Sequence, residues 1–182
     1  MRWYTKACLG LPLALALLGR TALAADMAQG PAPEFTHRAA DEWLNSPPLT
    51  LAGLRGKVVL VEFWAFDCAN CLHTHAWVES VAHSKKAAGL VVVGVHTPEL
   101  PQEKSPANVR AAVQRLGIDY PVMLDGDYSY WHALDNHYWP GFYLIDRDGR
   151  LVARAYGELH VGEDNARKVE GAIDRLLAAP AT

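Results

Sequence analysis

The sequence predicts one α/β domain in which a central β-sheet is flanked by helices. Short runs of apolar residues alternate along the chain with longer stretches of helical periodicity, a pattern typical of alternating strands and helices. The run VVLVEFW at residues 58–64 is almost continuously apolar, as expected for a strand buried on both faces. The chain has 182 residues, of which 51% are hydrophobic, so it can fill one core without disulfide staples.

Turn and capping residues set the limits of the expected elements. Ser105 is a suitable N-cap with Pro106 at the first helical position, and Gly117 ends that helix. Asp148 and Gly149 form a hairpin turn between the last two strands. The expected order is βαβαβαββα, preceded by a short edge strand at residues 49–51. Strands are expected at residues 58–64, 90–95, 122–124, 141–145 and 151–156, and helices at residues 68–86, 106–116, 128–135 and 165–178.

Charge and cysteine content exclude several classes of protein. The formal net charge is -3, whereas a nucleic-acid-binding protein needs a basic surface. Three cysteines are too few for a disulfide-rich secreted scaffold. We therefore expect no nucleic-acid partner, and a monomer that folds around its own core.

The first 24 residues have the pattern of a secretory signal peptide. Arg2 and Lys6 precede an apolar run at residues 7–18, and ALA at residues 22–24 is a small-residue cleavage site. The apolar run is too short to cross a bilayer as a helix, although an uncleaved N-terminal anchor is the alternative. Cleavage predicts a periplasmic or otherwise exported protein. The expected organisation is a signal peptide at residues 1–24, a linker and N-terminal extension at residues 25–48 with the linker at residues 25–33, and the domain at residues 49–182.

Two cysteines form a C-x-x-C pair where the first buried strand meets its helix. Removal of the signal peptide takes away Cys8 and leaves Cys68 and Cys71. Such a pair can bind zinc, attach haem, form a structural disulfide or act in redox chemistry. At the start of a helix the free backbone N–H groups and the helix dipole stabilise a thiolate, so this position favours redox chemistry. Cys71 lies one turn further along the same face, which predicts an exposed attacking sulfur at Cys68 and a shielded sulfur at Cys71.

Several segments resemble the thioredoxin-like superfamily in order and spacing. They are VEFWAFDCANC at residues 61–71, GVHTPE at residues 94–99, ANVR at residues 107–110, GIDYPV at residues 117–122 and YWPGFYLID at residues 138–146. Together they resemble the exported TlpA-like branch, in particular its DipZ-like members. The resemblance implies a thioredoxin-like fold with a mixed sheet, an inserted βα segment between the C-x-x-C helix and a cis-proline strand, and thiol–disulfide oxidoreductase activity.

The resemblance also implies catalytic roles for residues that match these motifs. Cys68 attacks a client disulfide as a thiolate, and Cys71 then resolves the mixed disulfide. Glu62 matches the buried strand acid of the family. Its carboxyl is expected to have a pKa raised by burial and to exchange a proton with Cys71.

Three further residues are expected to border the client. Pro140 matches the cis-proline that faces the dithiol, Trp139 narrows the groove beside it, and Trp64 forms a wall of the site. The sequence departs from thioredoxin itself by placing Asp67 directly before the first cysteine. A carboxylate beside Cys68 disfavours the thiolate, so the reduction potential and the direction of electron flow stay open.

Two other functions stay open as well. His73 and His75 follow the pair closely, and two thiols with two imidazoles could ligate a soft metal such as Cu(I). A Cu(I)-binding metallochaperone that uses the same thiols is therefore the alternative, and a binding module with a structural disulfide is the third class. One helix directs Cys68, Cys71 and His75 to a common face but not His73, so we expect no metal site and no cofactor.

A reductase of this size needs partners. The sequence contains no dinucleotide or flavin fingerprint, so electrons have to come from another protein. For an exported protein we expect a membrane electron-relay protein, besides a client protein that carries a disulfide or a dithiol. His96 opens the loop of the HTPE segment and is expected to border the client face.

Overall fold

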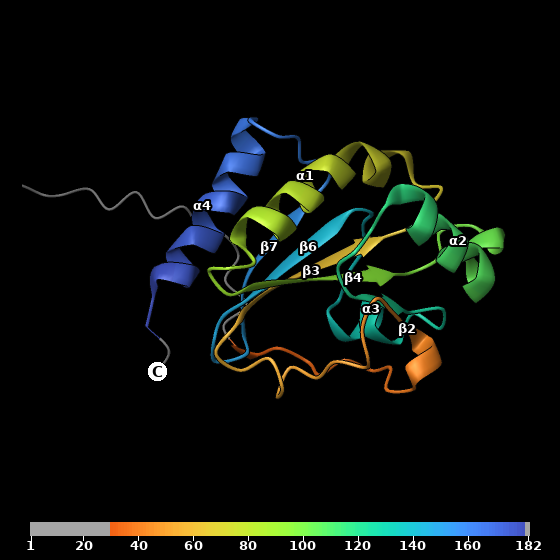
Figure 1. The fold of residues 1–182 in the computed structure, drawn as a ribbon, viewed down its shortest axis with the longest axis horizontal. Coiled ribbons are helices and arrows are strands. Elements are labelled where there is room, and N and C mark those ends of the chain that lie inside the picture. Colours follow the sequence, from red (N-terminus) through yellow and green to blue (C-terminus); the bar gives the residue numbers. More distant parts are fainter. Residues whose placement is uncertain (1–29, 181–182) are drawn as a thin grey trace, which may run out of the picture.

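A seven-stranded mixed sheet forms the centre of the computed structural model, which describes residues 30–180 (Figure 1). The strand order is β1-β7-β6-β3-β4-β5-β2. The parallel strands are β3 (Val58–Trp64), β4 (Leu90–His96) and β5 (Val122–Leu124). The strands that pair antiparallel are β6 (Gly141–Ile145) with β3, β7 (Arg150–Tyr156) with β6, β1 (Gly30–Pro31) with β7, and β2 (Trp43–Leu44) with β5.

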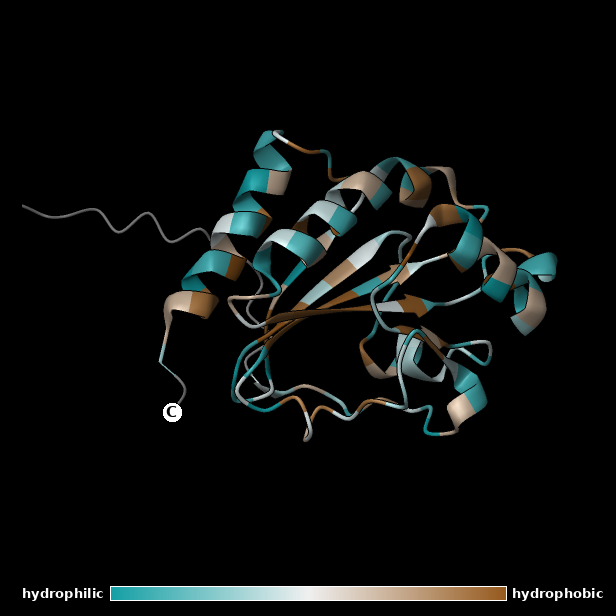
Figure 2. Ribbon diagram, in the orientation of Figure 1, coloured by the Kyte–Doolittle hydropathy of each residue, from teal (hydrophilic) through white to brown (hydrophobic). Residues whose placement is uncertain are grey.

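Helices cover both faces of this sheet (Figure 1). One face carries α1 (Ala69–Lys85), α2 (Pro106–Leu116) and α4 (Asp164–Ala178), and the other carries α3 (Ser129–Ala133) with the N-terminal segment and its short helix η1 (Ala40–Glu42). Figure 2 shows β3 and β4 as the most hydrophobic part of the ribbon, while α1 and α4 carry many hydrophilic residues. The predicted α/β class, with a mixed sheet and flanking helices, is confirmed.

Strand β3 contributes side chains to the hydrophobic cores on both faces of the sheet. Its side chains alternate, so that Leu60 and Trp64 join the cluster beneath α1, α2 and α4, whereas Val61 and Phe63 join the cluster on the opposite face. All seven residues of β3 are buried. The almost continuous apolar run in the sequence therefore reflects burial on both faces.

The expected boundaries hold closely for the central elements. Ser105 caps α2 by accepting a hydrogen bond from the backbone of Asn108, and Gly117 ends the helix in the left-handed region at φ 72°. The stretch between α1 and β6 contains β4, the short helix η2 (Pro101–Lys104), α2, β5 and α3. That this stretch is an insertion relative to other thioredoxin-like chains stays a prediction.

The strand expected at residues 49–51 is wrong. Leu51 begins a series of turns, and its N–H donates to the Glu34 carboxylate at 2.6 Å instead of a neighbouring strand. The Thr50 hydroxyl likewise accepts the N–H of Gly53. Side-chain acceptors therefore replace the ladder partners that an edge strand would need.

The N-terminal extension adds two short strands, β1 and β2, to the sheet. The linker predicted at residues 25–33 is wrong for residues 30–33, since β1 pairs there with β7 and the N–H of Ala32 donates to Gly149. Phe35 and Trp43 are buried against each other with ring centroids 5.4 Å apart. The predicted signal peptide and its alternative, an uncleaved anchor, lie outside the described residues. Between residues 30 and 180, no helix is long and apolar enough to cross a membrane.

Phe35→Ala tests whether the extension is part of the cooperative core. The side chain is 1% exposed and packs on Trp43 and Tyr130, so its removal should lower the free energy of unfolding by about 3–5 kcal/mol. Urea denaturation measures this loss. Arg38→Ala, at an exposed position of the same segment, should change it by less than about 0.5 kcal/mol. Equal effects of the two variants would contradict this packing.

Candidate active site

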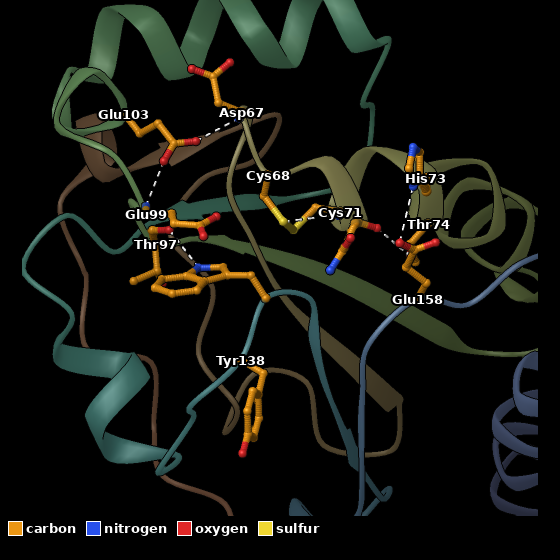
Figure 3. The surroundings of a disulfide bond; sticks show 12 residues. Asp67, Cys68, Cys71, His73, Thr74, Thr97, Glu99, Glu103, Tyr138 and Glu158 are labelled. Carbon is orange, nitrogen blue, oxygen red and sulfur yellow. Dashed lines mark hydrogen bonds and ion pairs between the residues drawn. A yellow bond between two sulfur atoms is a disulfide. The ribbon is translucent and has the colours of Figure 1, made fainter.

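Cys68 is the N-cap of α1, as the strand–helix junction predicted (Figure 3). Its sulfur accepts a hydrogen bond from the backbone N–H of Cys71 at 3.2 Å, and its carbonyl accepts the N–H of Leu72. The two cysteines form a disulfide, with their Cα atoms 5.3 Å apart. The structure is therefore that of the oxidised form. On reduction, a thiolate at Cys68 would face the N–H groups and the positive end of the helix dipole.

Both cysteines are buried, although the sequence predicted that only Cys71 would be shielded. Cys68 is 6% exposed and Cys71 is 3% exposed, so the prediction of an exposed attacking sulfur is wrong for this oxidised form. Both residues pack in the cluster beneath α1, and the disulfide holds the first sulfur against the second. The contrast between the cysteines thus comes from the N-cap position of Cys68 more than from its exposure.

Glu62 is a fully buried carboxyl in the middle of β3. It is 2% exposed and lies on the same face of β3 as Leu60 and Trp64, which belong to the same cluster as Cys71. Burial raises the pKa of Glu62 to about 8, although a hydrogen bond from the Tyr120 hydroxyl opposes the shift. That bond spans 3.2 Å. A carboxyl with this pKa can both hold and release a proton near neutral pH.

Gly94 leaves space for the buried pair of Glu62 and Tyr120. It lies opposite Glu62 in the β3–β4 ladder. A Cβ atom at Gly94 would lie 3.1 Å from the Tyr120 ring and 3.0 Å from the indole nitrogen of Trp64, closer than side chains normally pack. The absence of a side chain at this position therefore lets both rings close over the strand.

The residues predicted to border the client take different positions. The Trp139–Pro140 peptide bond is cis. Trp139 is partly buried, packs on Trp131 with ring centroids 4.1 Å apart and ring planes tilted by 36°, and donates its indole N–H to the carbonyl of Thr97. Trp64 is 3% exposed, so it lies in the core beneath the site. A contact between any of these residues and a client stays a prediction.

His96 lies in the interior instead of bordering the surface. It is 2% exposed, its ring stacks on Phe66, and burial lowers its pKa to about 4. The expectation that it borders the client face is wrong for this structure, because its strand position turns the imidazole into the core beside Trp64. A neutral imidazole is the form that such an environment favours.

The histidines near the cysteine pair are engaged elsewhere. His73 contacts the Glu158 carboxylate at 3.3 Å, and a ring nitrogen of His75 lies 2.9 Å from the carbonyl of Leu116. Within residues 30–180, one group of three potential ligands lies close enough to share a metal, and it does not include the thiols. It consists of His37, Asp125 and Asp127. Asp125 also accepts backbone N–H groups in the first turn of α3.

Two residues of the site escaped the sequence analysis. Tyr120, the partner of Glu62, stands within the GIDYPV segment, so the resemblance held a signal for it. Glu103 lies between β4 and α2, where the sequence analysis singled out only His96, and its side chain is 1% exposed. Its carboxylate binds the backbone of Asp67, the residue before Cys68 (Figure 3).

Comparison with known proteins gives the family. The Redoxin family matches residues 27–172 of the chain. Protein DipZ of Mycobacterium tuberculosis is 44% identical over 132 residues, which cover 71% of this chain and 19% of DipZ. The thiol–disulfide oxidoreductase YkuV of Bacillus subtilis is 27% identical over 148 residues, which cover 81% of this chain and 95% of YkuV. The chain therefore belongs to the Redoxin family.

Solved structures agree with this assignment. The thioredoxin-like superfamily protein SPOA0173 matches with a TM-score of 0.73 and 27% sequence identity, over 84% of this chain and 99% of the other. A thioredoxin-like protein solved in its oxidised form matches with a TM-score of 0.70 and 28% identity, over 83% of this chain and 97% of the other. The chain spans about a fifth of the length of DipZ, so it corresponds to one part of that protein.

Glu62→Gln tests the buried carboxyl. The pKa of Glu62 is raised from 4.5 to about 8, so the folded state holds the proton more tightly than the unfolded state. Its contribution to stability is complete below pH 4.5, falls as pH rises to about 8 and then stays constant. The glutamine variant lacks this loss, so its stability relative to the natural chain should increase with pH over that range.

Urea denaturation of the oxidised protein at about pH 5 and about pH 9 measures the effect. Glu163→Gln, at an exposed position where the side chain makes no capping bond, should leave the pH dependence unchanged. A pH dependence that is the same in Glu62→Gln and the natural chain would contradict the raised pKa.

Proposed function

We propose that this chain is an exported thiol–disulfide oxidoreductase that reduces disulfides in client proteins. The observation that carries the proposal is the position of Cys68, at the N-cap of α1 and in a disulfide with Cys71. A purely structural bridge would not need a sulfur that accepts a backbone N–H at the start of a helix. The same position stabilises the thiolate that attacks a disulfide.

The reaction transfers two electrons from the dithiol to the client. The Cys68 thiolate attacks one sulfur of the client disulfide, a mixed disulfide forms, and the other client sulfur leaves as a thiolate. The Cys71 thiol loses its proton and attacks the sulfur of Cys68. The bond between Cys68 and the client then breaks, which leaves the client as a dithiol and the protein as the observed disulfide.

Glu62 is the proposed proton acceptor for Cys71. Its carboxyl lies on the face of β3 that contributes to the core around Cys71, and its pKa of about 8 is close to that of a thiol. Tyr120 holds one carboxyl oxygen through its hydroxyl, which leaves the other for proton transfer. Pro140 and Trp139 are the proposed client-facing residues, with Trp64 as support beneath them.

The cellular setting follows from the first residues and from the chemistry. The pattern at residues 1–24 supports export to an oxidising compartment, where a reductase works only if it is recharged. A membrane electron-relay protein is the proposed source of electrons, since it can carry reducing equivalents across the bilayer. A monomer is sufficient, because both sulfurs and Glu62 come from one chain.

Serine substitutions test the two sulfurs separately. Cys68→Ser should lower insulin reduction to the uncatalysed rate, because it removes the nucleophile. Cys71→Ser should abolish turnover but accumulate a mixed disulfide between Cys68 and the client, detectable by non-reducing gel electrophoresis and mass spectrometry. Ala69→Ser, at the exposed position between the cysteines, should keep activity. Activity that persists in Cys68→Ser would contradict the proposal.

The same samples test the Cu(I) alternative. His73 contacts Glu158 and His75 contacts the carbonyl of Leu116. The thiols therefore lack the imidazole ligands that a Cu(I) site of two thiols and two imidazoles would use. A titration of the reduced protein with Cu(I), in competition with a chelator, should show no binding that depends on His75. Tight stoichiometric binding together with no insulin reduction would favour the metallochaperone.

A further inference from the structure

The segment that leads from β4 to α2 carries a buried carboxylate beside the cysteine pair. Glu103 belongs to η2 and is 1% exposed. Its carboxylate accepts three backbone N–H groups, from Glu99 and Leu100 at 2.7 Å each and from Asp67 at 2.8 Å. Figure 3 shows this side chain reaching from the loop toward the turn before Cys68. Three short bonds to a charged acceptor offset much of the cost of burying it.

Two of these bonds are local, and the third is not. Glu99 and Leu100 lie within the same loop as Glu103, so their bonds shape η2 itself. Asp67 is 36 positions away and immediately precedes Cys68. A carboxylate that only capped η2 would have no need of the Asp67 N–H. The third bond therefore fixes the backbone that leads into the N-cap of α1.

Gln102, the residue before Glu103, holds the side chain of Asp67. Its amide donates to the Asp67 carboxylate at 2.9 Å. Figure 3 shows that carboxylate directed away from the bond between Cys68 and Cys71. A negative charge close to Cys68 would disfavour its thiolate, so an orientation away from the sulfur reduces this penalty.

The loop that carries Glu103 is itself anchored at its other end. The Thr97 hydroxyl donates to the buried carboxylate of Asp125, and the Thr97 carbonyl accepts the indole N–H of Trp139. The hydroxyl of Tyr128 also donates to the carbonyl of Pro98. Glu103 thus holds Asp67 from a segment that is tied to the β5–α3 loop and to the residue before Pro140.

We propose that Glu103 is a positioning residue for Cys68, which holds the Asp67 backbone so that the Cys68 sulfur stays on the N–H of Cys71. Gln102 contributes by keeping the Asp67 carboxylate turned away. The inference rests on the proposed function, because it assigns Glu103 a role in tuning the attacking thiol. Other charged groups around the pair are the exposed carboxylate of Glu99, the His73–Glu158 pair beside α1, and the buried Glu62.

The test is the pH profile of Cys68 alkylation by iodoacetamide in the reduced full chain, resolved by mass spectrometry. Glu103→Gln and Glu103→Asp should each raise the apparent pKa of Cys68 by about one unit, which slows alkylation about tenfold below that pKa. The aspartate variant keeps the charge but is too short to reach all three N–H groups. Glu99→Gln removes a charge from the same loop without touching the Asp67 backbone, and it should keep the natural profile.

The variants separate positioning from two simpler roles. If Glu103 acts only through its charge, Glu103→Gln should speed alkylation and Glu103→Asp should leave it unchanged. If Glu103 only stabilises the loop, both variants should lower the melting temperature and keep the alkylation profile of the folded protein. Either result overturns the inference.

A second measurement decides the matter if the Glu103 variants fail to fold. Gln102→Ala should slow Cys68 alkylation, and the effect should vanish when Asp67 is also changed to Asn, since no carboxylate is then released. Effects that simply add would overturn the inference. Failure of the proposed function looks different, because Cys68→Ser would then keep insulin reduction whatever the Glu103 variants do.

Discussion

The hydrogen bond from the Cys71 N–H to the Cys68 sulfur is the interaction on which the site depends. It exists because the chain passes from β3 into α1 within a few residues and places Cys68 at the helix N-cap. Free N–H groups at that end of a helix stabilise negative charge, which a nucleophilic sulfur must carry. The C-x-x-C spacing then brings the second sulfur within bonding distance after one turn.

Strand β3 and the loop after β4 hold this corner in place. β3 supplies a rigid base because its side chains are buried in both cores. The same strand places Glu62 on the face that belongs to the core around Cys71, and burial raises the pKa of its carboxyl to about 8, so that it can hold or release a proton near neutral pH. The loop after β4 reaches back through Glu103, and it also accepts the indole of Trp139. This one loop therefore contacts both the residue before Cys68 and the residue before Pro140.

Local patterns were sufficient to predict the elements that frame the site. The apolar run of β3, the Ser105 cap and the Gly117 stop are sequence-local signals, and the structure reproduces their positions. The short strands β1 and β2 were not predicted, because two-residue strands have no periodicity and depend on distant partners. Long-range contacts also account for the buried Glu103 and the Tyr120–Glu62 bond, since composition alone marks a charged loop residue as exposed.

The most direct measurement of the central claim is the reduction potential of the Cys68–Cys71 couple, determined in glutathione buffers of defined ratio. A reductase with a stabilised but accessible thiolate should have a potential close to that of thioredoxin, about −270 mV. A potential near −120 mV would instead indicate a disulfide donor. A disulfide that fails to exchange with glutathione at all would contradict a catalytic role for this pair.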